Sequence, residues 1–294
     1  MAESRFRDPE DIKKRVTGDI KKLNQRLLEI AVRLDKEARV HLITETLPGK
    51  ILTSFYRKAV NTTKAIELLK KNMLIEEAWV LLRVLLEAHV NFCYFLRKSS
   101  EDPILICQRY ADSSILEKLK HLREVNFYQG TDMAALHSPE KWEATETEIR
   151  ARYNEKELKA MRHYGFSGLS FEGRAKAVGL KSMYEFCYRI ASRSVHMFDP
   201  AETSTWTDYE LSGLPFELPE LLQSRREALE SAQNMLLGRV SFVLAQMLQK
   251  HSFSAELMLV GLGYEKFIDR TAGPVRHDSE HKDDPPGSFY IWRE

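Results

Sequence analysis

The sequence predicts an all-α protein whose main part is a single large multi-helix domain. Only 13 Gly and 10 Pro occur among 294 residues, so few positions interrupt regular structure. Between them, apolar residues recur at the three- and four-residue spacing of a helix, and no stretch shows the alternation that predicts a strand. Hydrophobic residues make up 43% and charged residues 30%, which is ordinary for a globular chain with a substantial core.

The first three helices are predicted from their starts, stops and apolar stripes. Asp8 and Pro9 form a favourable N-cap and first-turn pair for a helix over residues 9–37. After LPGK, a second helix is expected over residues 51–72. A third, over residues 75–97, is apolar enough to be a core helix, and SSEDP marks its end and the next start. The stripe of the first helix is Leu23, Leu27, Ile30 and Leu34.

The middle of the chain predicts further helices. Two are expected over residues 103–127 and 138–162. The second is so charged (EKWEATETEIRARYNEKELKAMR) that a solvated face or arm is predicted. A Gly/Ser turn, HYGFSGLS, then leads into a short helix over residues 171–178 and into the helix that carries His196.

The last part of the chain predicts two helices and a tail. FDPAETSTWTDYELSGLPFELP is rich in turn formers and reads as a loop. Helices follow over residues 218–250 and 253–269, and the polar, proline-rich end is predicted to be mobile. The expected layout is an N-terminal helical extension (1–48), a main helical domain (49–270) and a flexible tail (271–294).

Charge and cysteine content limit the classes of function. Lys+Arg 44 against Asp+Glu 43 gives no global field toward nucleic acid or anionic membrane, so a nucleic-acid role requires a local basic patch. The Lys/Arg clusters at 13–15, 118–123 and 225–226 are interleaved with acids and are predicted to be solvated. The scattered thiols of Cys93, Cys107 and Cys187 indicate a reducing compartment.

The same features predict a cytoplasmic protein that does not enter a membrane. The N-terminus, MAESRFRDPEDIKKR, lacks the apolar region of a secretory signal. No run is expected to reach the ~18 apolar residues of a membrane span. Zinc binding needs clustered Cys and His, and a di-iron bundle needs Glu-x-x-His pairs, so neither a metal nor a cofactor is predicted.

Two lines of polar residues stand out against the apolar background. In AWVLLRVLLEAHVNFCYF, Arg83, Glu87 and Asn91 follow one another every fourth residue and therefore share one helix face. In YRIASRSVHMF, Tyr188, Ser192 and His196 repeat this spacing. Buried polar groups need partners, so the two lines are predicted to face each other.

The first polar line has two interpretations that the sequence leaves open. Arg83, Glu87 and Asn91 can form a network that fixes the packing register of the core. Alternatively, Arg83 faces an anionic ligand, with Glu87 holding its guanidinium and Asn91 orienting a partner. A fully buried pair would make Glu87→Ala costly, by roughly 3–5 kcal/mol.

His196 is the candidate for chemistry. Its tautomer can be fixed by the hydroxyls of the second line, and Arg189 and Arg193 lie seven and three residues before it. Such a group suits phosphodiester cleavage, because arginine offsets phosphate charge while histidine moves a proton. The structural alternative is a histidine that caps a helix end beside solvated arginines.

Two blocks of this chain resemble the uncharacterised bacterial family DUF5677. LLRVLLEAHVNFCYFLRK is similar to its Arg-x3-Glu-x3-Asn helix. GFSGLSFEGRAKAVGL with YEFCYRIASRSVHMFDP resembles its second block, a Ser-Gly turn, a short helix with an Arg, and Tyr-x3-Ser-x3-His. The similarity covers roughly residues 50–250.

The helical layout of that family is in turn similar to the HEPN group (higher eukaryotes and prokaryotes nucleotide-binding). This resemblance implies a HEPN-like helical core and a metal-independent ribonuclease acting as a toxin or in phage defence. It implies RNA as substrate and a homodimer, with Arg189 matching the group's Arg and His196 its His. The alternative function is a non-catalytic helical interaction or ligand-sensing module, whose polar cluster is structural or binds a small anion.

Overall fold

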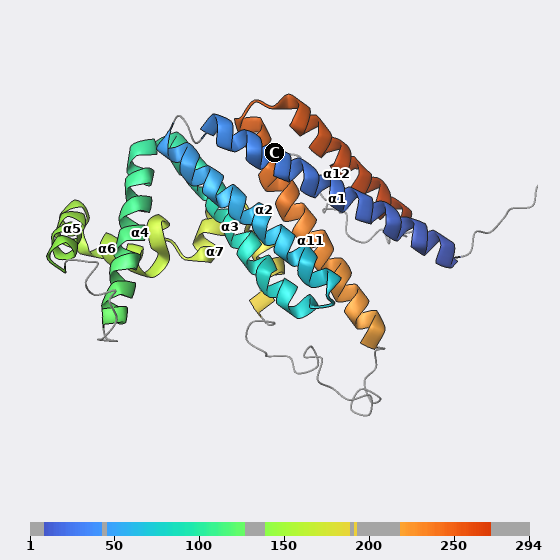
Figure 1. The fold of residues 1–294 in the computed structure, drawn as a ribbon, viewed down its shortest axis with the longest axis horizontal. Helices are drawn as coiled ribbons and strands as arrows, with labels where there is room; N and C mark the ends of the chain where they lie inside the picture. Colours follow the sequence, from blue (N-terminus) through green and yellow to red (C-terminus); the bar gives the residue numbers. More distant parts are fainter. Residues whose placement is uncertain (1–8, 43–45, 127–138, 189–190, 193–217, 272–294) are drawn as a thin grey trace, which may run out of the picture. The chain divides into compact units, whose positions relative to one another are not determined.

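The computed structural model describes residues 9–42, 46–126, 139–188, 191–192 and 218–271, and every regular element within them is helical (Figure 1). The predicted all-α class is therefore confirmed. In chain order the elements are α1 (Pro9–Leu42), α2 (Leu47–Lys71), α3 (Ile75–Glu101), α4 (Pro103–Asn126), α5 (Pro139–Arg152), α6 (Glu155–Tyr164), the 3-10 turn η2 (Gly165–Ser167), α7 (Phe171–Ala177), α8 (Lys181–Met183), the π-helix η3 (Tyr184–Tyr188), α11 (Leu218–Met247) and α12 (His251–Thr271).

The chain divides into two compact units. Unit 1 holds residues 1–46, 53–89 and 187–294, and unit 2 holds residues 47–52 and 90–186. Within unit 1, α1 packs against both α11 and α12. The predicted domain boundaries at residues 48 and 270, and the mobile tail, which lies outside the described residues, stay predictions.

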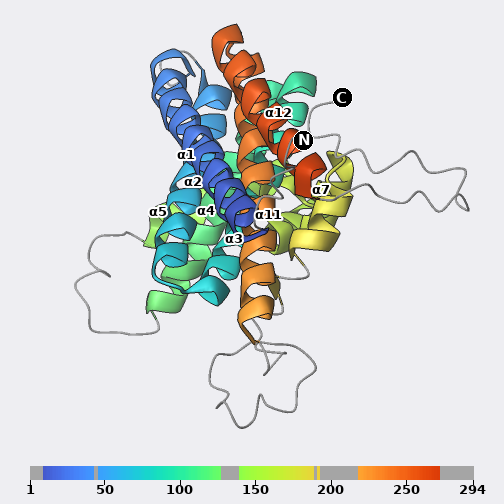
Figure 2. The same cartoon turned by 90° about the vertical axis from the view of Figure 1, so that its right-hand side faces the viewer.

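The core of unit 1 is built from apolar stripes on α1, α2, α3, α11 and α12. Figures 1 and 2 both show α1, α11 and α12 side by side. A Cβ added at Gly263 of α12 would lie 2.7 Å from Leu23 Cδ2, so this glycine permits the close approach of α12 to α1. The fully buried side chains of α1 include the predicted stripe residues Leu27, Ile30 and Leu34.

Tyr56 joins three helices of unit 1 by one hydroxyl group. Its OH donates to the Ala31 carbonyl oxygen at 3.2 Å and lies 2.9 Å from Ser241 Oγ. The ring is fully buried, and this burial raises the pKa of the Tyr56 hydroxyl. The phenol therefore stays neutral and fixes α2 against α1 and α11.

The charged segment around residues 139–164 has a solvated face, as one of the two predicted alternatives had it, but it is not an arm, because a narrow stripe of its residues is buried. It forms two helices of unit 2 rather than one, because Asn154 caps α6 through a capping box with Glu157. The apolar side chains of both helices enter a core with α4, and the buried Glu146 carboxylate accepts from Arg150 and Arg162. That core consists of Leu116, Ile149, Leu158 and Met161, with Ile115 and Tyr153 packed against it.

Helix α3 also differs from one expectation. By length and composition it contains an 18-residue window apolar enough to cross a membrane, although no such run was expected. Within the structure 56% of that window is buried. Core helices of soluble proteins have the same composition, so the window alone is weak evidence for a span.

Candidate functional site

Arg83 and Glu87 form an ion pair on the outer side of α3. Arg83 Nε donates to Glu87 Oε1 at 3.2 Å, and the two side chains are 28% and 40% exposed. The condition for a cost of roughly 3–5 kcal/mol, full burial of the pair, is thus not met, because solvent reaches both groups. The pair is open to a ligand, and its contribution to stability is smaller than that of a desolvated pair.

Tyr188 brings the second polar line to the first. The guanidinium carbon of Arg83 lies 4.5 Å from the centre of the Tyr188 ring, a cation–π contact inside unit 1. Arg83 is therefore held by the Glu87 carboxylate and by an aromatic face from a segment about a hundred residues later. The prediction that the two lines face each other is confirmed for this pair.

The rest of the two lines is less completely described. Ser192 lies in a short helical piece, and its buried Oγ finds no hydrogen-bond partner among the described residues. Asn91 belongs to unit 2, and its buried Oδ1 likewise lacks a described partner. Arg189, Arg193 and His196 lie outside the described residues. Their placement beside the Arg83 pair stays a prediction.

The segment that carries Tyr188 is a π-helix rather than the expected α-helix. Residues 184–188 form this wider turn directly after α8. π-Helical turns are rare in proteins, and those that occur often lie at functional sites. The wider turn redirects side chains that an α-helix would align. Sequence spacing alone cannot predict such a turn, because the apolar pattern of YEFCY fits either helix.

A second arginine extends the polar face of α3 toward its start. Arg225 donates through Nε and Nη2 to the two carboxylate oxygens of Glu76, at 2.8 and 2.7 Å. Its guanidinium lies 5.8 Å from the Trp79 ring, and its side chain is only 12% exposed. The interpretation of Arg225 as part of a solvated face is corrected. The sequence signal that could have found this pair is Glu76, which lies seven residues before Arg83 and therefore on the same face of α3.

Arg174 of the second block organises the Gly/Ser turn in unit 2. Its Nη1 donates to the carbonyl oxygens of Tyr164 and Leu169 at 2.9 and 2.8 Å, and to Ser167 Oγ at 3.0 Å. Gly165 and Gly168 have φ of 72° and 63°, which favours glycine. The arginine of this block therefore has a structural role, in which it holds a tight turn.

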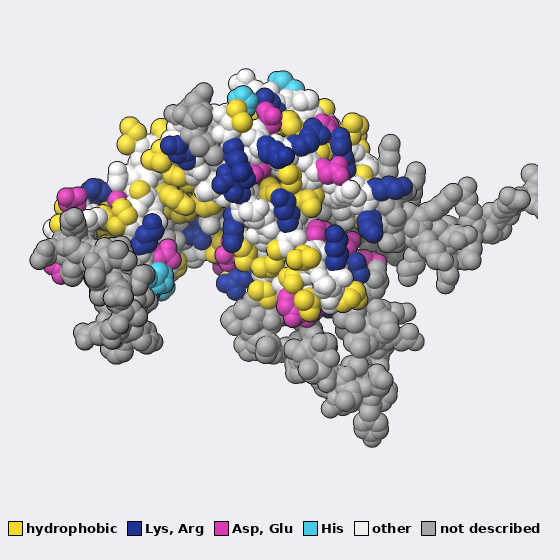
Figure 3. All heavy atoms as spheres, viewed as in Figure 1, with side chains coloured by type: hydrophobic (Ala, Val, Ile, Leu, Met, Phe, Trp, Pro, Cys, Tyr) yellow, Lys and Arg dark blue, Asp and Glu magenta, His cyan; other side chains and the backbone are white. Residues whose placement is uncertain are grey.

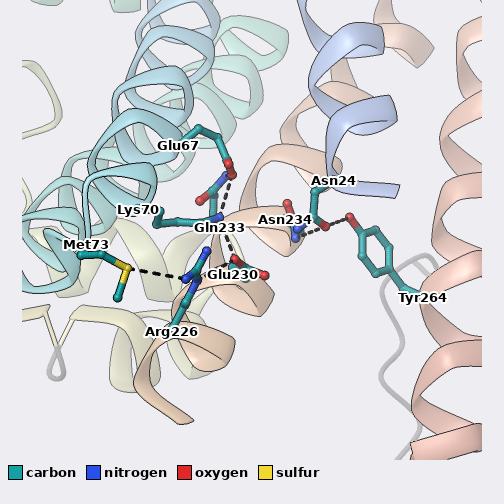
Figure 4. Close-up of polar contacts among 9 residues, drawn as sticks. All are labelled: Asn24, Glu67, Lys70, Met73, Arg226, Glu230, Gln233, Asn234 and Tyr264. Carbon is teal, nitrogen blue, oxygen red and sulfur yellow. Dashed lines mark hydrogen bonds and ion pairs between the residues drawn. The ribbon is translucent and has the colours of Figure 1, made fainter. Parts of the chain in front are cut away.

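A buried polar cluster in unit 1, the Lys70 cluster, was not found by sequence reasoning (Figure 4). Lys70 Nζ lies 2.8 Å from Glu67 Oε1 and 3.2 Å from Glu230 Oε1, and its side chain is 4% exposed. Gln233 Nε2 also donates to Glu67 at 2.7 Å. The ammonium group thus joins α2 to α11 and is matched by two carboxylates.

A hydrogen-bonded trio lies nearby in unit 1 (Figure 4). Tyr264 OH and Asn234 Nδ2 both donate to Asn24 Oδ1, at 2.5 and 2.7 Å, which links α12 and α11 to α1. Burial raises the pKa of the Tyr264 hydroxyl, and the negative charges of Glu230 and Glu67 raise it further. Because the Tyr264 hydroxyl stays protonated, it is suited to a structural hydrogen bond and not to transfer of a proton.

Two buried side chains that carry nucleophilic or basic atoms are unsuited to chemistry. His89 on α3 is 1% exposed, and its burial, then the charge of Arg239, lowers the pKa of its imidazole to about 3. Burial raises the pKa of the Cys187 thiol to about 12. Among the described residues, no group of three His, Cys, Asp or Glu side chains is placed to hold a metal ion.

These features define an all-α protein with a half-buried Arg–Glu–Tyr site on a core helix. The chain belongs to the family of unknown function DUF5677, whose model matches residues 49–203. The matched region includes both blocks on which the sequence resemblance was based, and the resemblance to this family is confirmed. No curated protein matches the chain, and no solved structure does.

Proposed function

We propose that this protein is a HEPN-like, metal-independent ribonuclease that acts as a toxin or in phage defence. The observation that carries the proposal is the contact between Arg83 and Tyr188. It joins the Arg-x3-Glu helix to the segment that leads into His196, as a composite site would require. The half-exposed state of the Arg83–Glu87 pair also supports a site that meets a ligand.

In this mechanism the ribose 2′-OH is the nucleophile. His196 takes the 2′-OH proton or gives a proton to the leaving 5′-oxygen, while Arg189 and Arg193 stabilise the charge on the phosphorane. The new bond joins the 2′-oxygen to phosphorus, and the bond from phosphorus to the 5′-oxygen breaks. The products are a 2′,3′-cyclic phosphate and a 5′-hydroxyl. Arg83, held by Glu87, supplies a further cation.

The experiment is cleavage of tRNA and mRNA by the purified full chain, with and without EDTA. Cyclic phosphate ends should form in the presence of chelator. His196→Ala and Arg189→Ala should each lower the rate by about 10²-fold or more, as loss of a transition-state charge donor does. His251→Ala, an exposed histidine at the start of α12, is the matched control and should cleave normally.

Results of this experiment separate the proposal from its alternative. Absence of cleavage, together with normal growth on induced expression, would favour the non-catalytic interaction or ligand-sensing module. The observation that favours this alternative is that Arg83 already has two protein partners, Glu87 and Tyr188. Cleavage that disappears with chelator would refute the metal-independent mechanism.

The proposal includes a cytoplasmic homodimer. Light scattering of the purified chain measures the oligomeric state, and the expected mass is twice 34.2 kDa. Fractionation of expressing cells tests the location, and the protein should remain in the soluble fraction. Recovery with the membranes would favour a spanning role for α3.

A further inference from the structure

Helix α2 carries a row of cations at heptad spacing. Arg57, Lys64 and Lys71 follow one another every seventh residue, so they lie along one side of the helix, with Lys58 beside them. The helix contains six Lys and Arg residues and a single carboxylate, Glu67. Because the whole chain is nearly neutral, this charge is concentrated locally.

The three lysines of this row have no partner among the residues that the structure describes. Lys58, Lys64 and Lys71 are exposed, and none forms an ion pair with a described residue. Glu67, the one carboxylate of α2, is engaged by Lys70 and Gln233. The charge of these three lysines is therefore uncompensated among the described residues, whereas Arg57 lies 3.8 Å from the Asp35 carboxylate. Figure 3 shows dark blue Lys and Arg side chains along the course of α2.

The opposite face of α2 is committed to the core of unit 1. Tyr56, Ala59, Val60 and Ile66 are buried there. A helix that binds in a membrane interface must offer its apolar face to lipid, and α2 cannot do so. The exposed face is mainly cationic, and it also carries the amide of Asn61 and one apolar side chain, Leu68, which is 62% exposed.

We infer that this row, the α2 basic row (Arg57, Lys58, Lys64 and Lys71), binds the phosphate backbone of an RNA strand. From Arg57 to Lys71 the row extends about 21 Å, because a helix rises about 1.5 Å per residue. A linear polyanion can place one phosphate beside each cation of such a row, whereas a compact anion could contact only one of the cations. The inference rests on the proposed function and adds to it the path that the substrate follows.

The test is binding of a fluorescein-labelled single-stranded RNA to the full chain, measured by anisotropy across salt concentrations. The His196→Ala background prevents turnover. Replacing Lys58, Lys64 and Lys71 together by Ala should weaken binding at low salt at least tenfold. It should also reduce the slope of log K against log salt by about 2, since each phosphate contact on a single strand contributes about 0.7.

The control removes the same charge from lysines that already have carboxylate partners. Lys176, Lys181 and Lys250 pair with Glu172, Glu185 and Glu37, and their triple Ala variant should change the affinity and the slope little. Equal losses in both triple variants would show a general charge effect and would overturn the inference. So would unchanged affinity in the α2 variant.

The binding measurement tests this inference, and the cleavage measurement tests the proposed function, so the two can fail separately. If the wild type binds RNA through the α2 basic row without cleaving it, the nuclease proposal fails and the inference stands. If the wild type cleaves RNA while the α2 variant binds it normally, the inference fails alone. Capture by vesicles containing phosphatidylserine through the same lysines, with no RNA binding, would overturn the inference in favour of a membrane surface.

Discussion

Replacing His89 by Leu should make the protein less sensitive to acid. The imidazole is buried in unit 1, and its Nδ1 atom has no hydrogen-bond partner among the described residues. Burial, and then the charge of Arg239, lowers the pKa of His89 to about 3. The unfolded chain exposes the same imidazole at its ordinary pKa of about 6.5.

The magnitude follows from the difference between these two pKa values. Because the pKa of the folded state is depressed, the contribution of His89 to stability is complete above about pH 6.5. It is lost as the pH falls from there toward about 3, since the unfolded state binds a proton that the folded state does not. At pH 5.0 the loss amounts to about 2 kcal/mol, while at pH 7.5 it is about 0.1 kcal/mol or less.

The assay is urea unfolding of the wild type and His89→Leu at pH 7.5 and 5.0. The free energy of unfolding should fall by about 2 kcal/mol more in the wild type than in the variant between these two pH values. Val240→Ala is the control, because it removes buried methyl groups of α11 without removing a titrating group. Equal pH losses in the wild type and His89→Leu would refute the assignment of His89 as a buried neutral base.

Three further substitutions are expected to rank by how deeply the lost partner is buried, with urea unfolding as the measurement. Glu87→Ala should cost only about 0.5 kcal/mol, because its pair with Arg83 is half-exposed, and a loss of 3 kcal/mol would refute that placement. Lys70→Met should cost about 3 kcal/mol, since it leaves Glu67 without its counter-charge and Glu230 with Arg226 alone. Tyr153→Phe should cost about 2 kcal/mol through the lost 2.8 Å hydrogen bond to buried Asp112, and a melt like that of the wild type would show that water replaces the hydroxyl.

Most helices could be predicted from the sequence because their signals are local. Apolar spacing and the Asp102-Pro103 start predicted α3 and α4 closely, since caps and stripes act within a few residues. The single helix expected over 138–162 was wrong because the capping box of Asn154 and Glu157 starts a second helix. Glu146 is buried among arginines, and such pairing depends on neighbours that the local sequence does not reveal.

The candidate site was predicted less completely. The spacing of Arg83 and Glu87 correctly indicated their ion pair, and the contact with Tyr188 followed from the need of polar groups for partners. The exposure of this pair did not follow, because it depends on what the facing elements cover. The Lys70 cluster was missed for a related reason. Its members come from α2 and α11, more than 150 residues apart, and each alone resembles an ordinary surface charge.

The pairing of α1 with α11 and α12 has a consequence for synthesis of the chain. About 180 residues separate the end of α1 from the start of α11, so a ribosome working at 5–20 residues per second needs about 10 to 35 s to deliver the partner. During that interval the stripe of Leu27, Ile30 and Leu34 has no α11 or α12 to cover it. Unit 1 can close only after α11 and α12 have been made, and the nascent α1 is a natural client for chaperones that hold apolar helices.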